Sequence, residues 1–445
     1  MVSASVLRRN QFRVVRLPPE HFRTVVIQVP STQCIIALYL LRKVILAEQS
    51  SSTKSLAGDG QPGAPLAPWT YSNSELFELE YTEFFLKRWQ FVGHVNEVVG
   101  VGDYITADIG RDNVLVVRGK DEELRAFLNV CRHRASRILE GAGTCRGVIR
   151  CPYHGWTYQF DGSLMAIPQQ DDFPGIDRSD YGLRAVQLEV YNGLIFIRVA
   201  GSGRSVAEQF SHTADFFEKY DVANYEQIAP PTAEVWDVNW KVAWDNYLEN
   251  YHIAIGHPGL QRLLIEDGEA DDLSSGVSYG VFVLKDMPSK VEEERRYQEL
   301  LQHADYRLPD DLKGKWVQFG LAPNLGLDLY PEMLDLFRLV PLAPDKTMVH
   351  AAYYGHKNPT PEEMELRRLN IQINERVNEE DRQLCTRVQQ GLSTYRYRPG
   401  PLSQQESTIF NFHEMMRKRL PVMSLEHEPG EGLVAAENDA MLKQG

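Results

Sequence analysis

Several features common in other protein classes are scarce in this 445-residue sequence. Its five cysteines are too few and too uneven for a disulfide framework, which favours a reducing compartment. Acidic residues outnumber basic ones by 61 to 47, and the net charge of −14 argues against a general nucleic-acid binder. Residues 25–41 form the most apolar stretch near the N-terminus, but polar residues interrupt it, so we expect no stable membrane insertion.

Residues 1–66 differ in composition from the rest of the chain. The first 50 residues contain seven Lys or Arg and only two acidic residues, and residues 50–68 are rich in Ser, Gly, Pro and Ala, as linkers are. We therefore interpret residues 1–66 as a basic leader and linker without an assigned function. Two interpretations of these residues stay open: a leader that targets the protein to an organelle, and a gene start assigned too far upstream. Without an organelle-targeting leader, we expect a cytoplasmic protein.

Residues 85–200 contain short β runs separated by turn signals. Asp161-Gly162 and Asn192-Gly193 each lie between two apolar runs, which predicts two hairpins. Two short motifs, Cys131-x-His133 and Cys151-x-x-His154, adjoin β runs and can occupy hairpin tips. A structural zinc site is the alternative, but zinc fingers usually pair Cys with Cys and His with His. One Cys and one His in each motif favour a Rieske [2Fe-2S] cluster, with two thiolates on one iron and two imidazoles on the other. Cys34, Cys145 and Cys385 receive no role.

A second group of polar residues lies within residues 239–260. Apolar side chains recur there at steps of three and four, which predicts a helix; they are Trp244, Tyr247, Leu248, Tyr251 and Ile255. Glu249 and His252 are one turn apart, and Gly256 with Pro258-Gly259 should turn the chain and bring His257 back toward His252. Two such imidazoles can bind a metal ion; the alternative is a pair of ordinary histidines at a helix end.

A carboxylate in a later helix is the candidate third ligand. Val377, Asp381, Leu384 and Val388 recur at helical spacing, which predicts that Asp381 lies in an apolar stripe while Glu379, Glu380 and Arg382 point elsewhere. A buried carboxylate needs a partner or a metal. The alternative is a charged residue at the edge of the stripe. If Asp381 is not a ligand, Asp335 and Glu365 are the next candidates.

The segments NVCRHRASRILEG…CPYHGWTYQFDGSL and NWKVAWDNYLENYHIAIGHPG resemble the two metal-binding motifs of Rieske non-haem iron oxygenases, and the similarity extends over about residues 70–420. The segment EEDRQLCTRVQQGLSTYRYRPGP resembles the third-ligand segment of that family. The resemblance implies a Rieske cluster on Cys131, His133, Cys151 and His154. It also implies a mononuclear Fe(II) on His252, His257 and Asp381, with open positions for O₂ and substrate. Ala135 departs from the glycine that is frequent in the family.

After residue 228, apolar runs predict strands at residues 233–238, 277–284, 316–321, 334–342 and 347–354. The resemblance implies how such strands are arranged. We expect an α+β protein in which an N-terminal antiparallel β Rieske domain precedes a helix-grip (START-like) catalytic domain with a curved antiparallel sheet and a long C-terminal helix. The expected boundaries are 67–205 for the N-terminal helix and Rieske domain, 206–422 for the catalytic domain and 423–445 for a C-terminal tail.

The chain has no dinucleotide or flavin motif, because the glycines at 141, 143 and 147 have the wrong spacing. Electrons must therefore come from a separate NAD(P)H-dependent flavin or iron–sulfur reductase or a ferredoxin. In the family, subunits form trimers, and the acid three residues before the first His bridges the cluster of one subunit and the iron of its neighbour. Most members have Asp there, whereas this chain has Glu249.

With Glu at position 249, the segment DNYLENYH resembles the branch of the family that acts on carnitine and betaines. The leading hypothesis is therefore the terminal oxygenase of a monooxygenase that hydroxylates or demethylates a small quaternary ammonium compound of betaine, carnitine or choline type. The alternative is a ring-hydroxylating or O-demethylating oxygenase for an aromatic carboxylate. A pure electron carrier would leave about 240 residues and the second ligand set unexplained. Candidate pocket residues are Trp316, Phe319, Tyr330, Phe337, Tyr353 and Tyr354.

Overall fold

The computed structural model describes residues 64–266, 276–303 and 308–444, together with the backbone of three strands near the N-terminus. These strands, β1 (Val6–Arg9), β2 (Phe12–Arg16) and β3 (Thr24–Gln28), form an antiparallel sheet within a separate compact unit, residues 1–61. The rest of the predicted leader and linker lies outside the described residues, up to residue 63. Among the helices of the described residues, none is both long and apolar enough to cross a membrane.

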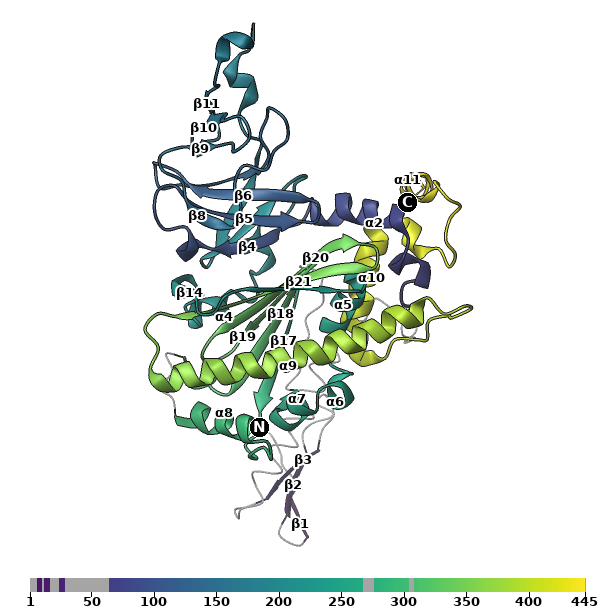
Figure 1. The fold of residues 1–445 in the computed structure, drawn as a ribbon. Coiled ribbons are helices and arrows are strands. Elements are labelled where there is room, and N and C mark those ends of the chain that lie inside the picture. The colour runs from purple at the N-terminus through teal and green to yellow at the C-terminus, as the bar shows by residue number, and fades with distance from the viewer. Residues whose placement is uncertain are drawn as a thin grey trace, which may run out of the picture. The chain divides into compact units, whose positions relative to one another are not determined.

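The first domain of the larger unit is built on an antiparallel sheet of seven strands (Figure 1). In spatial order they are β4 (Gln90–His94), β13 (Leu194–Arg198), β12 (Ala185–Tyr191), β7 (Leu124–Leu128), β6 (Asp112–Arg118), β5 (Asp103–Ile109) and β8 (Ala142–Thr144). A smaller sheet contains β9 (Ile149–Arg150), β10 (Thr157–Tyr158) and β11 (Leu164–Ala166). Both predicted hairpins are present: Asp161-Gly162 joins β10 to β11, and Asn192-Gly193, with positive φ at both residues, joins β12 to β13.

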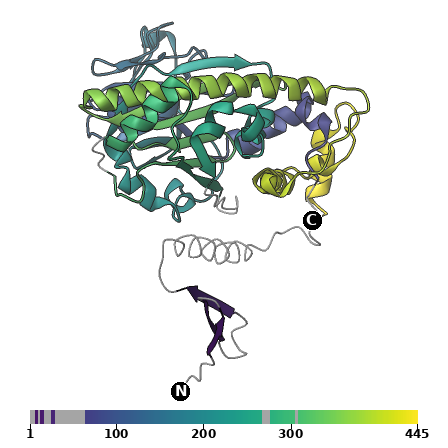
Figure 2. The ribbon, with the colours of Figure 1, turned by 90° about the horizontal axis from the view of Figure 1, so that it is seen from below.

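The second domain is built on an eight-stranded antiparallel sheet. Its order is β14 (Tyr225–Gln227), β21 (Lys346–His356), β20 (Leu334–Ala343), β19 (Leu325–Leu329), β18 (Lys315–Leu321), β17 (Val277–Leu284) and β16 (Leu264–Glu266), with β15 (Thr232–Trp236) also paired to β21. The long helix α9 (Pro361–Leu392) crosses this sheet (Figures 1 and 2). The predicted α+β architecture is confirmed, although β14, β16 and β19 were not foreseen.

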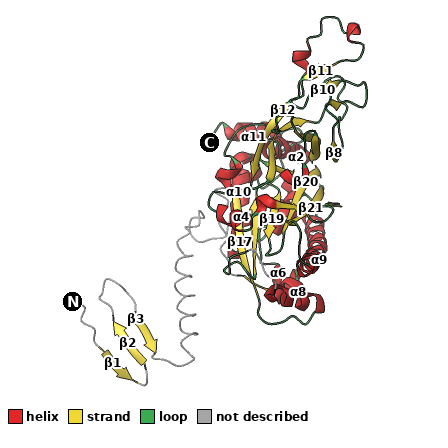
Figure 3. Ribbon diagram, turned by 90° about the vertical axis from the view of Figure 1, so that its left-hand side faces the viewer, coloured by secondary structure: helices red, strands yellow, loops and turns green. Residues whose placement is uncertain are grey.

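The other helices of the described residues are α2 (Ser74–Glu80), α3 (Val206–Gln209), α4 (Ala214–Lys219), α5 (Trp240–Tyr247), α6 (Ile253–Gly256), α7 (Pro258–Leu263), α8 (Glu292–His303), α10 (Ser407–Arg419) and α11 (Val434–Leu442) (Figure 3). The segment predicted as a tail contains α11, which packs against α2. The Glu75 carboxylate of α2 accepts backbone hydrogen bonds from Gly432 and Val434, so this segment is held to the N-terminal helix.

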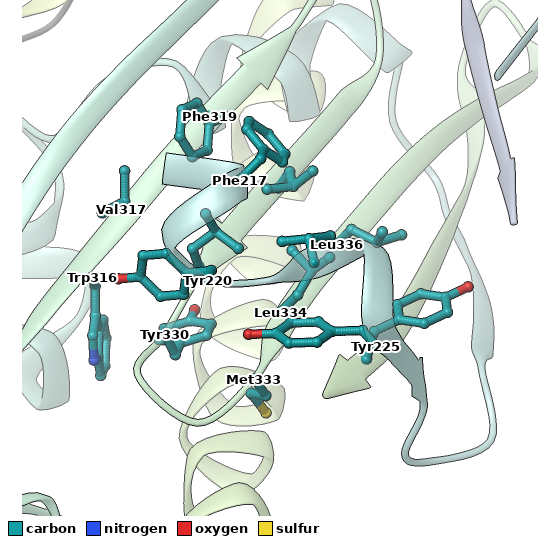
Figure 4. Packing of buried hydrophobic residues seen from close by; sticks show 14 of the residues in the cluster. Phe217, Tyr220, Tyr225, Trp316, Val317, Phe319, Tyr330, Met333, Leu334 and Leu336 are labelled. Carbon is teal, nitrogen blue, oxygen red and sulfur yellow. The ribbon is translucent and has the colours of Figure 1, made fainter. Parts of the chain in front are cut away.

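Aromatic and aliphatic side chains form the core of the catalytic domain between its sheet and its helices (Figure 4). Trp316 and Tyr330 meet edge to face with ring centroids 4.8 Å apart, and Phe217 of α4 packs on Phe319 of β18 at 5.2 Å. Burial of these large rings fixes α4 and the sheet in place, so the polar residues on neighbouring strands have defined positions.

Candidate metal centres and substrate pocket

The two Cys/His motifs of the first domain adopt matching loops. The Cys131 carbonyl accepts a hydrogen bond from Ala135 N at 3.1 Å, as the Cys151 carbonyl does from Gly155 N, also at 3.1 Å. Ala135 and Gly155 hold the same place in the two loops, and both have left-handed φ values, +56° and +74°. This position favours glycine, which explains why the family often has Gly where this chain has Ala135.

In these loops the sulfur atoms point inward and the imidazoles outward. Cys131 and Cys151 are buried side by side, and the Tyr158 hydroxyl lies 3.2 Å from Cys131 Sγ. The rings of His133 and His154 lie on the outer side with centroids 4.6 Å apart. His133 Nδ1 is buried without a hydrogen-bond partner among the described residues. A buried ring nitrogen that lacks a hydrogen-bond partner is suited to bind a metal. The four residues therefore fit a [2Fe-2S] cluster with two sulfur and two imidazole ligands.

The helix predicted from about residue 239 to Gly256 is interrupted. Helix α5 ends at Tyr247, and two short helices, α6 and α7, follow. The Glu249 carboxylate accepts hydrogen bonds from the backbone amides of Tyr251 and His252, which replaces helical bonds at this point. As a result Tyr251 and Ile255 do not continue the stripe of α5, and they are exposed by 58% and 89%. The prediction of one continuous helix through these residues is wrong.

The interruption nevertheless brings the two histidines together with the carboxylate on α9. His252 Nε2 and His257 Nε2 are 3.0 Å apart, and Asp381 Oδ1 lies 2.9 Å from His257 Nε2 and 3.5 Å from His252 Nε2. Asp381 Oδ1 is buried and forms no well-oriented hydrogen bond with a described residue. Two imidazoles and one carboxylate that converge in this manner fit a divalent iron ion and leave its other positions open. The alternative candidates Asp335 and Glu365 are not part of this group.

Each histidine has a second carboxylate on its other ring nitrogen. Glu249 Oε1 lies 2.5 Å from His252 Nδ1, and Glu380 Oε2 lies 2.8 Å from His257 Nδ1. Such contacts fix the tautomer of a ligating imidazole and increase its basicity. The prediction that Glu380 points elsewhere is wrong. Position 380 is three residues after Val377 and four before Leu384, so its spacing to the stripe was a signal that it lies near the site.

The carboxylates also control the charge of the imidazoles. Burial lowers the pKa of His252, but the carboxylates of Asp381 and Glu249 outweigh it and raise the pKa to about 9. Burial raises the pKa of Asp381, but the two neighbouring imidazoles outweigh it and hold the pKa below its usual value. The Asp381 carboxylate is therefore ionised at neutral pH, as metal binding would require.

A pocket with aromatic walls opens beside this group. Its aromatic lining residues are Trp236, Tyr247, Phe282, Trp316, Tyr330 and Phe337. Three of the six predicted residues, Trp316, Tyr330 and Phe337, therefore line it, whereas Phe319, Tyr353 and Tyr354 do not. The charged or titratable lining residues other than tyrosine are Glu249, His252, His257, Asp328, Asp335 and Asp381. No Lys or Arg is among the described lining residues.

Comparison with known proteins assigns both domains. Residues 88–187 match the family model of the Rieske [2Fe-2S] domain, and residues 217–421 match that of the ring-hydroxylating alpha subunit catalytic domain. The carnitine monooxygenase oxygenase subunit of Acinetobacter pittii is 36% identical over 201 residues, which cover 44% of this chain and 54% of that protein. The chain thus matches about half the length of that relative.

Two further matches extend over most of the chain. The glycine betaine monooxygenase oxygenase subunit of Pseudomonas aeruginosa is 28% identical over 380 residues, 79% of this chain and 87% of that protein. A crystal structure of the quaternary ammonium Rieske monooxygenase CntA in complex with L-carnitine shares the fold, with a TM-score of 0.68, 24% identity and coverage of 82% of this chain and 99% of that one. The chain therefore contains a Rieske [2Fe-2S] domain followed by a ring-hydroxylating alpha subunit catalytic domain.

Proposed function

We propose that the chain is the terminal oxygenase of a multicomponent monooxygenase that acts on a small quaternary ammonium compound. The observation that carries the proposal is the convergence of His252, His257 and Asp381 on the wall of an aromatic pocket, in a chain that also has a Rieske domain. In the reaction, O₂, two electrons and two protons convert a substrate C–H bond to C–OH and release one water molecule. Where the hydroxylated carbon is bonded to nitrogen, the C–N bond then breaks. The hydroxylated carbon leaves as an aldehyde with release of one proton, and the nitrogen keeps the bonding electron pair as a tertiary amine.

In this proposal, Cys131, His133, Cys151 and His154 hold the cluster, and His252, His257 and Asp381 hold the iron. When bound, the cluster supplies single electrons and the iron activates O₂. Electrons come from a separate reductase or ferredoxin, and the chain assembles as a homotrimer. Glu249, which contacts His252 Nδ1 at 2.5 Å, connects this imidazole to the electron path from the neighbouring subunit.

The composition of the pocket supports a cationic substrate. Aromatic rings attract quaternary ammonium groups, which cannot donate hydrogen bonds. An aromatic carboxylate, in contrast, would meet four lining carboxylates and no described Lys or Arg side chain. The pocket therefore favours the quaternary ammonium class over the aromatic acids.

The experiment is substrate-dependent consumption of O₂ and NADH by the reconstituted protein with a surrogate reductase. The panel contains choline, glycine betaine, carnitine and benzoate, and the organic product is identified in each case. We expect coupled turnover with at least one quaternary ammonium compound. Coupled turnover of benzoate with none on any quaternary ammonium compound would overturn the proposal.

A further inference from the structure

Two carboxylates face each other in the wall of the pocket. Asp328 of β19 and Asp335 of β20 are direct partners across the two antiparallel strands, so their side chains lie on the same face of the sheet. Both line the pocket. Asp335 is only 7% exposed, and its side chain forms no hydrogen bond or ion pair with a described residue.

Among the described residues, no Lys or Arg side chain interacts with the pair. The Tyr247 hydroxyl has one proton, and two acceptors compete for it: Phe319 O at 2.8 Å and Asp328 Oδ1 at 3.1 Å. The other titratable groups that interact with the pair are the phenols of Tyr330 and Tyr353. Burial raises the pKa of Asp335 well above its ordinary value and that of Asp328 to about 7, because no positive group offsets the loss of water.

The other two carboxylates of the pocket, unlike Asp328 and Asp335, lie where a bound metal ion could balance their charge. Asp381 and Glu249 contact the histidines of the candidate iron site, so a divalent ion bound there would balance their two charges. The charges of Asp328 and Asp335 would remain without a counter-ion. Like charges directly opposite each other on neighbouring strands are unfavourable, and a buried charge is retained at low cost only when it is paired.

We propose that Asp328 and Asp335 form an anionic subsite for the ammonium group of the substrate, which is therefore a monocation of choline type without a carboxylate. The inference rests on the proposed function and narrows its substrate class. A quaternary nitrogen offers no N–H group, so the carboxylates act on it through charge, while the neighbouring rings of Trp316, Tyr330 and Phe337 contact its methyl groups.

The same subsite disfavours a zwitterion. A glycine betaine or carnitine molecule would bring its own carboxylate into a pocket with no Lys or Arg among the described lining residues. The amide groups of Asn246, Asn250 and Gln318 are neutral and can bind a hydroxyl group as well as a carboxylate. The pocket therefore matches a positive group at the aspartate pair and an uncharged polar group elsewhere.

Binding to the purified, metal-loaded protein by titration calorimetry at pH 8 tests this inference, because Asp328 is then above its pKa of about 7. The probes are choline, glycine betaine and 3,3-dimethylbutan-1-ol, in which carbon replaces the choline nitrogen. Asp328→Asn keeps the size of the side chain and removes its charge. We expect this variant to weaken choline binding by about 100-fold and to change binding of the neutral alcohol by about twofold or less.

Asp345→Asn is the matched control, because it removes the same charge from an exposed position between β20 and β21. It should leave the affinity for choline unchanged. Asp335→Asn should act in the same direction as Asp328→Asn, which guards against a folding defect in one variant, and the thermal transition of each variant is recorded. Wild-type affinity for choline in both aspartate variants would overturn the inference, as would equal or tighter binding of glycine betaine than of choline by the wild-type protein.

The two proposals fail in different ways. If benzoate is turned over and no quaternary ammonium compound is, the proposed function fails. If quaternary ammonium compounds are turned over but the neutral variants bind choline normally, the function stands and the anionic subsite is wrong. Retained choline binding would mean that the aspartates act as neutral hydrogen-bonding groups or that the aromatic rings alone hold the cation.

Discussion

Replacement of Glu380 tests whether the second carboxylate on His257 supports metal binding. Glu380 Oε2 lies 2.8 Å from His257 Nδ1, on the ring nitrogen opposite the one that faces Asp381. Burial lowers the pKa of His257, but Asp381 and Glu380 outweigh it and raise the pKa. In Glu380→Ala the imidazole loses an acceptor that holds its orientation, while the three candidate ligands stay in place.

The expected loss follows from the position of this carboxylate. Removal of such an outer partner typically weakens metal affinity by about 10- to 100-fold, which is about 1.4–2.7 kcal/mol. The Glu380 side chain is 29% exposed, so water screens its charge in part, and we expect an effect near tenfold. Glu380→Gln keeps an oxygen acceptor without the charge and should lose less.

The assay is anaerobic titration of the metal-depleted mononuclear site with Fe(II) against a chromophoric chelator, with the visible spectrum of the cluster as the internal check on folding. The neighbouring residue Glu379 provides the control, because its carboxylate pairs with Arg382 at 2.7 Å and does not contact a histidine. Glu379→Ala should bind Fe(II) like the wild type. Equal Fe(II) affinities for Glu380→Ala, Glu379→Ala and the wild type would refute the reasoning.

Four further predictions concern the two centres. Cys131→Ser should abolish the visible absorption of the cluster, and stoichiometric zinc in a colourless wild-type protein would contradict the Rieske assignment. Asp381→Ala should lose the mononuclear iron and turnover but keep the cluster spectrum; full iron content would place the third ligand elsewhere. Glu249→Gln should bind the cluster and the iron and be reduced normally, yet transfer electrons from the cluster to the iron much more slowly in a single turnover. Glu249→Asp should be intermediate. Wild-type rates in Glu249→Gln would show that Glu249 does not connect the two centres. Because the pKa of His252 is raised to about 9, a proton must leave this imidazole when metal binds below that pH. The Fe(II) affinity of the metal-depleted site should therefore fall as the pH decreases from 9 to 6. An affinity that does not change with pH would argue against this linkage.

The sequence predicted the elements that local signals define. The Asn192-Gly193 turn required only its two residues, and the strands β17, β18, β20 and β21 appeared as long apolar runs. Strand β19 was missed because its five residues include a glycine and an aspartate, both of which are uncommon in strands. Its position between β18 and β20 depends on pairing with both neighbours, which local composition does not reveal.

The candidate iron site was predicted for a reason that is only partly correct. A continuous helix would place Glu249 and His252 on one face, and the structure does bring them into contact. However, the contact arises after α5 has ended, because the Glu249 carboxylate binds the amides of Tyr251 and His252. Helical periodicity alone could not distinguish these cases, since the competing hydrogen bonds come from a side chain rather than from the backbone pattern.

The facing aspartates show how a site can depend on strand register. Asp328 and Asp335 are seven residues apart, and the loop between their strands is closed by a hydrogen bond from Tyr330 N to Met333 O at 2.9 Å. This closure sets Leu329 opposite Leu334 and, one step further, Asp328 opposite Asp335. A shift of one residue on either strand would send the two carboxylates to opposite faces of the sheet. Each aspartate alone would be a polar residue in an apolar strand, and the register of this hairpin makes them a pair of charges directed into one pocket.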